Sequence, residues 1–255
     1  MISTVDQIPS TNAALVARAG GGDRLLEGDW LVADRQAAGR GRAGRAWSDG
    51  AGNFMGSTAV SLAAHETAPQ TLALVAGLSV HEAIMAHAPT LANCALKWPN
   101  DVLVDGAKLA GVLLERVGNT VVVGIGVNLV QAPDVPGRAT TSLARLGHAI
   151  ARDDFATTLA ACWQSNLAAW HRGEWPQLRV AWEGRALARG TLMSVNESTH
   201  GVVMGGFAGI DPDGVAQLRM ADGRLLAIHA GDVDLVGMID AQEDSAGPGP
   251  AGESA

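Results

Sequence analysis

The chain has 255 residues, of which 47% are hydrophobic and 17% charged, and its formal net charge is −8 at pH 7. This composition can bury a substantial core, which excludes wholesale disorder, and no apolar run approaches the roughly 18 residues that a membrane helix needs. Cys94 and Cys162 form no CxxC pattern and the histidines show no HExxH spacing, which argues against a disulfide framework, a thiolate zinc site and a metalloprotease. With no secretory signal visible at the start, we expect a soluble cytoplasmic protein.

Nearly all of the basic residues are arginines. Lys97 and Lys108 are the only lysines among eighteen basic residues, and the other sixteen are arginines. A lysine ammonium is a compact, rotatable charge and is not equivalent to a guanidinium where an oxyanion must be approached. The two lysines therefore suggest a site that binds an oxyanion. The alternative is that they have been retained by chance. The acidic balance disfavours a non-specific nucleic-acid binder, and we expect neither a nucleic-acid nor a membrane partner.

The larger, N-terminal part of the chain is predicted to mix helices and strands. The polar residues 10–12 are typical of a helix N-terminus, and the helix that follows stops at the glycines 20–22. Pro69 opens a long helix to about His87, and two further helices are predicted at about 155–171 and 174–187. Strands are predicted at 30–36, 53–62, 95–104, 108–117 and 120–130. Turn signals between the last three favour an antiparallel meander.

Short strands separated by Asp-Gly turns begin near residue 189. Four or five of them within about fifty residues suggest a small β-barrel, and the residues from Gln242 are of low complexity. We therefore expect an α+β fold with a mixed or antiparallel central sheet flanked by helices. The expected domains are a main domain at 1–187, a small barrel at 188–238 and a disordered tail at 239–255.

A glycine- and arginine-rich loop spans residues 39–47, and its first six residues match the GxGxxG pattern of dinucleotide-binding folds. That motif requires a helix directly after the glycines, whereas this segment runs into turn-forming residues and then a strand, which disfavours the dinucleotide interpretation. Arg40, Arg42 and Arg45 instead suit phosphate or carboxylate groups, and the glycines let backbone amides approach a ligand. A solvated basic loop is the alternative. Trp47 at its end is either a core residue or one that stacks on a ligand.

Polar residues and glycines also interrupt the predicted meander. Lys97 begins a Lys-Trp-Pro-Asn-Asp corner, in which Asn100 and Asp101 offer hard oxygens to Mg²⁺ or to an ammonium group. Lys108 interrupts an apolar stretch, and a buried lysine needs an anionic partner, which a substrate can supply. A lysine at a hairpin end is the alternative. The GIGVN segment at 124–128 places glycines within a strand, where they commonly mark close approach by a ligand.

Taken in order, these motifs resemble those of the biotin protein ligases, the enzymes that attach biotin to carboxylase subunits. The resemblance rests on Ser-Thr-Asn at 10–12, GRGRxGRxW at 39–47, KWPND at 97–101, the second lysine eleven residues after the first, and GIGVN at 124–128. It covers residues 8–235. It implies the class II synthetase-like biotin/lipoate ligase fold with a small SH3-like C-terminal barrel. It also implies the short class without an N-terminal DNA-binding domain, because the first motif lies close to the start of the chain.

The resemblance further implies an ATP-dependent ligase. Members of the family activate biotin as biotinyl-5′-AMP and transfer it to a lysine of a biotin carboxyl carrier protein or domain of acetyl-CoA carboxylase or a related carboxylase. ATP and Mg²⁺ are the implied cofactors, and no residue of the protein is assigned as a metal ligand. The resemblance is compatible with either a monomer or a homodimer. Because one anion attacks another, we expect catalysis to consist mostly of positioning and cationic stabilisation.

The resemblance also implies a set of site residues. The catalytic residues would be Lys108, Arg40, Arg42 and Asp101. Lys108 would hold the biotin carboxylate and the α-phosphate, and Asp101 would orient or deprotonate the acceptor lysine. The biotin-binding residues would be Ser10, Thr11, Asn12, Gln36, Gly39, Arg40, Gly41, Arg42, Lys108, Gly111, Gly124 and Gly126. The ATP-binding residues would be Arg42, Arg45, Trp47, Lys97, Asn100 and Asn128.

The sequence leaves two alternative functions open. A lipoate–protein ligase shares the fold and the adenylation step, but the arginine-rich loop favours biotin. Thr11 and Gln36 favour biotin too, because polar side chains suit a ureido group better than a dithiolane. A non-catalytic biotin-binding sensor is the second alternative. We would expect such a sensor to have lost Lys108 or the loop arginines.

Overall fold

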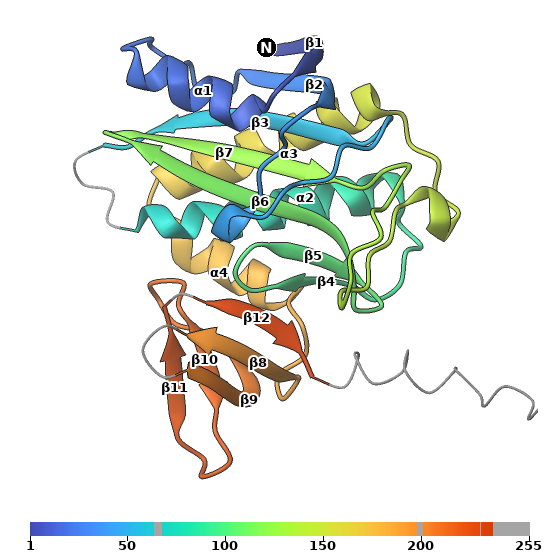
Figure 1. Cartoon of the computed structure of the whole chain (residues 1–255). Coiled ribbons are helices and arrows are strands. Elements are labelled where there is room, and N and C mark those ends of the chain that lie inside the picture. Colours follow the sequence, from blue (N-terminus) through green and yellow to red (C-terminus); the bar gives the residue numbers. More distant parts are fainter. Residues whose placement is uncertain (64–67, 198–200, 230, 237–255) are drawn as a thin grey trace, which may run out of the picture.

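The computed structural model describes residues 1–63, 68–197, 201–229 and 231–236 of the chain (Figure 1). It contains a seven-stranded sheet with the strand order β1-β2-β3-β7-β6-β5-β4 and a five-stranded sheet with the order β11-β10-β9-β8-β12. The chain therefore has the predicted α+β fold, with a mixed central sheet and a second, antiparallel sheet at the C-terminal side. The tail predicted at 239–255 lies outside the described residues.

The seven-stranded sheet is made of β1 (Ile2–Ile8), β2 (Trp30–Gln36), β3 (Phe54–Ser61), β4 (Cys94–Lys97), β5 (Asp101–Val104), β6 (Ala107–Val117) and β7 (Thr120–Val127). The helices are α1 (Thr11–Gly20), α2 (Leu72–His87), α3 (Arg152–His171) and α4 (Trp175–Glu183). The five-stranded sheet is made of β8 (Leu192–Glu197), β9 (Gly201–Ile210), β10 (Ala216–Arg219), β11 (Leu225–Ile228) and β12 (Asp232–Leu235).

Most elements follow the sequence pattern, with two differences in the larger sheet. The segment predicted as one strand at 95–104 is the antiparallel hairpin β4–β5, and the peptide bond between Trp98 and Pro99 at its turn is cis. The N-terminal strand β1 was not predicted from the sequence. It pairs in parallel with β2, and its residues are mostly exposed at the sheet edge, so the apolar alternation that signals a strand is weak.

The main core lies between the sheet and the helices α2 and α3, which pass behind the sheet in Figure 1. Eleven of the sixteen residues of α2 are buried, so this helix is enclosed on most sides instead of showing one apolar face. Phe54 of β3 packs edge-on against Phe155 of α3, with ring centroids 5.7 Å apart. Helix α1 packs against β3, β6 and β7 and leaves part of the sheet uncovered.

The smaller sheet lies below the β4–β5 end of the larger one (Figure 1). The chain after α4 pairs with β4, since Leu187 N donates to Leu96 O at 3.0 Å and Leu96 N donates to Arg185 O at 2.8 Å. Trp98 Nε1 donates to Gly214 O at 2.9 Å, which ties the corner between β4 and β5 to the smaller sheet. No helix among the described residues has the length and apolar character needed to cross a bilayer.

Candidate active site

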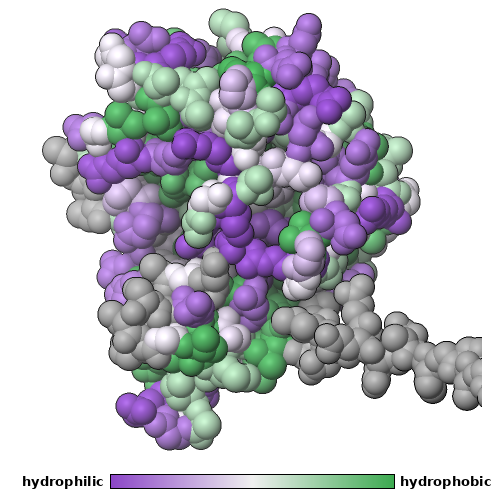
Figure 2. Space-filling view, viewed as in Figure 1, coloured by the Kyte–Doolittle hydropathy of each residue, from purple (hydrophilic) through white to green (hydrophobic). Residues whose placement is uncertain are grey.

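A cleft of about 1120 Å³, partly open to solvent, lies on the face of the larger sheet that carries α1. In Figure 2 hydrophilic side chains gather around a hollow in the middle of this face. The lining comes from the start of α1, the end of β2, the loop 39–47, strands β3 and β5–β7, and the loop 131–141. Sixteen of the eighteen residues that the sequence nominated line this cleft, and the two that do not are Gly39 and Lys97.

The cleft is positively charged although the whole chain is acidic. Its lining includes the cations Arg40, Arg42, Arg45, Lys108 and Arg138, and among the described lining residues it includes one carboxylate, that of Asp101. Cations concentrated in a concave, partly dehydrated site attract anionic ligands more strongly than the same cations in open water. The cleft is therefore suited to a ligand that carries several negative charges.

One end of the cleft is neutral and polar, and three buried side chains build it. Thr11 donates to Gln36 Oε1 twice, from its backbone N at 2.7 Å and from Oγ1 at 3.2 Å, and Thr11 Oγ1 lies 2.8 Å from Ser57 Oγ. Ser10 caps α1 by accepting from Ala13 N at 3.3 Å, so the helix start that holds these groups is fixed by its own hydrogen bonding.

Asn12 belongs to the same polar end. Its Nδ2 donates to Glu115 Oε2 at 2.6 Å, and Arg40 Nη1 donates to the other oxygen of that carboxylate at 3.2 Å. Asn12 is 4% exposed, and its Oδ1 is buried without a hydrogen-bond partner. That oxygen lies over Gly124, where an added Cβ would be 2.6 Å from it, so only glycine leaves room for the amide.

The loop 39–47 is a closed hairpin. Trp47 N donates to Gly39 O at 2.9 Å, and Gly41 N donates to Arg45 O at 2.7 Å. The tip turns through left-handed backbone at Ala43, with a φ of 53°. A Cβ on Gly39 would lie 2.5 Å from Trp47 O, so this glycine is required for closing the hairpin, which explains its place just outside the cleft lining.

The indole of Trp47 lies over the floor of the cleft. A Cβ on Gly126 would be 2.3 Å from Trp47 Cε2, and a Cβ on Gly111 would be 3.2 Å from Trp47 Cζ3. These two glycines are paired across β6 and β7, so together they form a flat floor beneath the ring. Lys108 Nζ is 5.8 Å from the ring centroid, which brings the indole, the glycine floor and the lysine into one compartment.

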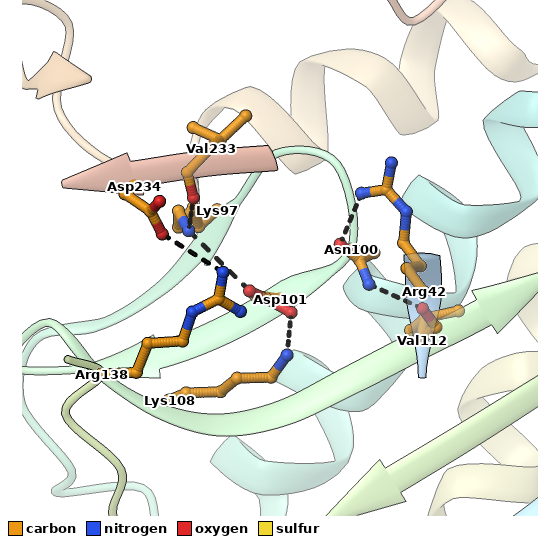
Figure 3. A network of polar contacts seen from close by, with 9 residues as sticks. All are labelled: Arg42, Lys97, Asn100, Asp101, Lys108, Val112, Arg138, Val233 and Asp234. Atoms are coloured by element: carbon orange, nitrogen blue, oxygen red, sulfur yellow. Dashed lines mark hydrogen bonds and ion pairs between the residues drawn. The ribbon is translucent and has the colours of Figure 1, made fainter. Parts of the chain in front are cut away.

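Lys108 and Asp101 form the central ion pair of the site, with 2.5 Å between Nζ and Oδ1 (Figure 3). The other oxygen of Asp101 lies 3.9 Å from Lys97 Nζ. Lys97 is directed away from the cleft and donates to Val233 O of β12. Burial lowers the pKa of Lys97, an effect that the nearby carboxylates of Asp101 and Asp234 oppose.

Two further contacts in Figure 3 hold cations at the rim of the cleft. Arg42 Nη1 donates to Asn100 Oδ1 at 3.1 Å, and Asn100 Nδ2 donates to Val112 O at 2.7 Å, so the loop is attached to the corner between β4 and β5 and through it to β6. Arg138 Nη2 lies 3.5 Å from Asp234 Oδ1, which links the loop 131–141 to β12 of the smaller sheet.

The site contains few groups that could bind a metal ion by themselves. The described residues include no cluster of three or more His, Cys, Asp or Glu side chains. Mg²⁺ commonly keeps several waters and binds through one or two protein oxygens together with substrate phosphates. Asn128 lines the cleft and donates from Nδ2 to Thr141 O at 3.1 Å, so its Oδ1 is the atom that can face a cation. Asn128 and Asp101 thus fit an ion carried on a phosphate ligand.

Ser57, Arg138 and Glu115 are among the site residues that were not nominated from the sequence. Ser57 lies in a strand that showed only its apolar pattern, and Arg138 lies in a segment without a recognisable motif. Glu115 lies behind the cleft lining and is reached only through its hydrogen bonds to Asn12 and Arg40. Alternation along β6 and β3 places polar residues on one face, but it does not say which remote side chain meets them.

Comparison with known proteins identifies the family. A model of the "Biotin/lipoate A/B protein ligase family" matches residues 6–129. Over 233 residues the chain is 38% identical to a biotin–acetyl-CoA-carboxylase ligase of Paracoccus denitrificans, an alignment that covers 84% of this chain and 92% of that protein. This chain belongs to the biotin protein ligases. A second biotin protein ligase, from Mycobacterium tuberculosis, is 37% identical over 240 residues, which cover 91% of this chain and 88% of that protein.

The fold comparison agrees with this family. The biotin protein ligase of Aquifex aeolicus, solved in complex with biotin and ATP, superposes with a TM-score of 0.78 at 28% identity. The superposition covers 92% of this chain and 97% of the other, so it includes both sheets and the region between them. The family predicted from the ordered motifs is thereby confirmed for this ligase.

Proposed function

We propose that this biotin protein ligase joins biotin to ATP in the cleft and then passes the biotinyl group to a lysine of a carrier domain of acetyl-CoA carboxylase. The observation that carries the proposal is the division of one cleft into a neutral polar end at Thr11 and Gln36 and a cationic end at Lys108. Biotin has a neutral ureido ring at one end and a carboxylate at the other. Its two ends therefore match the two ends of the cleft.

In the first step, a carboxylate oxygen of biotin attacks the α-phosphorus of ATP. An oxygen–phosphorus bond forms, the bond to the bridging oxygen of the β-phosphate breaks, and pyrophosphate leaves with the electron pair. No proton needs to move, but two anions must approach each other. Lys108 counteracts that repulsion because its ammonium lies where the cleft passes from polar to cationic, and the arginines of the loop add further positive charge.

The loop 39–47 retains the activated intermediate. Arg40 and Arg42 bind the biotin and phosphate oxygens, and the hairpin covers them so that water is kept from the mixed anhydride. Trp47 packs against the nucleotide base, while Arg45, Asn100 and Asn128 position the phosphates. Asn128 and Asp101 would hold a Mg²⁺ ion carried on the nucleotide, and that ion would supply charge neutralisation at the phosphates.

In the second step, the amine of the acceptor lysine attacks the carbonyl carbon of biotinyl-5′-AMP. A carbon–nitrogen bond forms, the bond from that carbon to the phosphate oxygen breaks, and AMP leaves. The attacking amine must lose protons, and Asp101 is the carboxylate of the cleft that can orient or accept one. Lys97 lies behind it, with its ammonium 3.9 Å from the Asp101 carboxylate, and helps to hold that carboxylate in place.

We also propose the domain division 1–187 and 188–238, in which the smaller domain holds the rim of the cleft through Asp234 and Val233. The proposed place of action is the cytoplasm, which fits the free thiols of Cys94 and Cys162.

The lipoate alternative is disfavoured because the Paracoccus and Mycobacterium relatives are both named for biotin. The sensor alternative is disfavoured because Lys108 and the loop arginines all line one cleft.

The proposal is tested by intact mass spectrometry of a purified biotin carboxyl carrier domain incubated with this ligase, biotin and Mg·ATP. We expect addition of one biotinyl group to the carrier. A carrier whose acceptor lysine is replaced by arginine is the matched control and should stay unmodified. An unmodified wild-type carrier, with the ligase folded and biotin bound, would contradict transfer and favour a sensor.

A further inference from the structure

A carboxylate beside the polar end of the cleft has a role that the proposed reaction does not define. Glu115 lies outside the lining, yet its two carboxylate oxygens hold one residue of the biotin-binding wall and one residue of the covering loop, Asn12 and Arg40. Glu115 lies on β6, and its side chain is 28% exposed, so it is partly shielded from water. Removing it would release both partners at once.

A carboxylate can only accept hydrogen bonds, and this fixes the orientation of the Asn12 amide. The atom of Asn12 that meets Glu115 Oε2 at 2.6 Å must be the NH₂ group, because an amide oxygen there would face another acceptor. Oδ1 is consequently turned to the opposite side, toward Gly124. It is buried and unpartnered there, and Gly124 belongs to the cleft lining.

Gln36, another residue of the cleft lining, has the opposite hydrogen-bonding character. Gln36 Oε1 accepts both hydrogen bonds from Thr11, so the Gln36 amide is also fixed in orientation. Its Nε2 hydrogens have no partner among the described residues and can donate to a ligand. The polar end thus offers an acceptor from Asn12 and a donor from Gln36, which is the arrangement that a ring N–H beside a ring carbonyl requires.

We infer that Glu115 is a positioning residue that fixes the Asn12 amide as an acceptor and thereby makes the cleft select a ligand with a ureido N–H group. This inference rests on the proposed function, because it takes biotin as the ligand. A buried acceptor without a partner is costly, and a ligand N–H that reaches Oδ1 removes that cost on binding. The contact between Glu115 and Arg40 also joins this selection to the loop that covers the ligand.

The test uses three ligands that differ at one position of the ureido ring. They are biotin itself and the two cyclic carbamate analogues in which an oxygen replaces one or the other ureido N–H. Calorimetric titration without ATP gives the dissociation constants. For the wild-type ligase we expect one of the two carbamates to bind about tenfold more weakly than biotin or worse, because its ring oxygen faces Asn12 Oδ1.

Two variants separate the positioning role from a structural one. In Glu115→Ala the Asn12 amide can turn its NH₂ toward the ring oxygen, so the preference for biotin over that carbamate should fall several-fold. In the double variant Asn12→Asp with Glu115→Gln, the amide introduced at position 115 donates to the introduced carboxylate, whose second oxygen faces the cleft as an acceptor. The double variant should therefore retain the preference, whereas Asn12→Asp alone places two carboxylates together and should lose affinity.

The matched control is Glu183→Ala. Glu183 also holds an arginine and another donor, with its Oε1 3.1 Å from Arg189 Nη2 and 3.0 Å from Ile210 N, but it lies away from the cleft. This variant should alter thermal stability without changing the ratio of dissociation constants. An unchanged ratio in Glu115→Ala, or equal binding of all three ligands by the wild type, would overturn the inference. Failure of the wild type to bind biotin at all would instead overturn the proposed function.

Discussion

Lys108 Nζ and Asp101 Oδ1 lie 2.5 Å apart across the hairpin of β5 and β6. Both side chains are mostly shielded from water, with 26% of Lys108 and 13% of Asp101 exposed. The pair holds the ammonium in the cleft before any ligand arrives. An anionic ligand at this point competes with the Asp101 carboxylate for the same ammonium, so the lysine is already placed where the biotin carboxylate and the α-phosphate are proposed to meet.

The first prediction concerns Lys108 itself. In Lys108→Ala we expect biotin-dependent pyrophosphate release to fall by about 100-fold or more, because one preorganised charge facing the transition state is lost. The loss of activity should exceed the loss of thermal stability. The measurement is single-turnover pyrophosphate release with saturating biotin and ATP.

The matched control for this variant is Arg116→Ala on the same strand. Arg116 is exposed, donates to Gly118 O and does not line the cleft, so its removal should leave the rate unchanged. Release by Lys108→Ala at a rate close to that of the control would show that Lys108 is not the group that stabilises the transition state.

The second prediction concerns retention of the intermediate. Arg42→Gly removes the hydrogen bond to Asn100, so the loop loses a guanidinium contact that attaches it to the corner between β4 and β5. We expect biotinyl-5′-AMP to escape and to label lysines of a bystander protein on the order of tenfold more than the wild-type ligase does. Mass spectrometry of serum albumin added to the reaction measures this labelling. Equal labelling by both ligases would rule out a retaining role for Arg42.

Much of the site followed from the sequence because its residues are grouped in short motifs. The loop 39–47, the corner 97–101 and the segment 124–128 each bring several lining residues, and sixteen of eighteen nominated residues meet in one cleft. The helix start at Ser10 was also predicted and caps α1 as expected. Local chemistry, turn formation and capping are properties that a short stretch of sequence determines.

The direction of Lys108 relative to Gly111 could not be predicted in this way. Side chains three positions apart on a regular strand point to opposite faces, yet Lys108 and Gly111 share the cleft. The register of β5 and β6 shifts between Val102 and Leu103, so an irregularity places Leu109 in the core and returns Gly111 to the face of Lys108. Alternation along the sequence contains no sign of this bulge.

Contacts between remote segments were also beyond the sequence. Lys97 was nominated for the ATP site because it shares a motif with Asn100 and Asp101. Its ammonium instead donates to Val233 O of β12, a partner 136 positions away. The pairing depends on how the smaller sheet packs on the larger one, and no local pattern around Lys97 encodes that packing.

The third prediction uses the lowered pKa of Lys97. The folded protein holds this lysine with a pKa below its usual 10.5, so between the lowered value and 10.5 the unfolded chain binds more protons than the folded chain. The stability of the wild type relative to that of Lys97→Met must therefore rise with pH across that window. Urea unfolding of both proteins between about pH 8 and pH 11 measures the difference.

The chain is well suited to this comparison. It has no tyrosine and only one other lysine. Burial raises the pKa of the Cys94 thiol to about 12, so in this window the thiol titrates in the unfolded chain and lowers stability as pH rises, but it does so in both proteins and cancels in their difference. A stability difference between wild type and Lys97→Met that stays constant or changes in the opposite direction would show that Lys97 is not held in a charge-disfavouring environment.

The fourth prediction concerns the floor beneath Trp47. Gly126→Ala introduces a Cβ 2.3 Å from the indole, so the ring must leave the floor and become more exposed. We expect a red shift of the Trp47 contribution to fluorescence and roughly a tenfold higher KM for ATP, because the hairpin loses its packing surface. The Trp47 contribution is obtained by subtracting the spectrum of the matching Trp47→Phe protein.

Gly20→Ala is the control, since its added Cβ meets Val117 at 3.9 Å, an ordinary contact distance. Unchanged emission and KM would show that Trp47 does not rest there.

The most direct test of the account is pyrophosphate release by the wild-type ligase with Mg·ATP, offered biotin in one reaction and lipoate in the other. The polar end at Thr11, Asn12 and Gln36 and the cationic end at Lys108 together predict release with biotin and none above background with lipoate. Release with lipoate alone would contradict the assignment of the polar end. Absence of release with either acid, from a folded ligase that binds biotin, would contradict adenylation in this cleft.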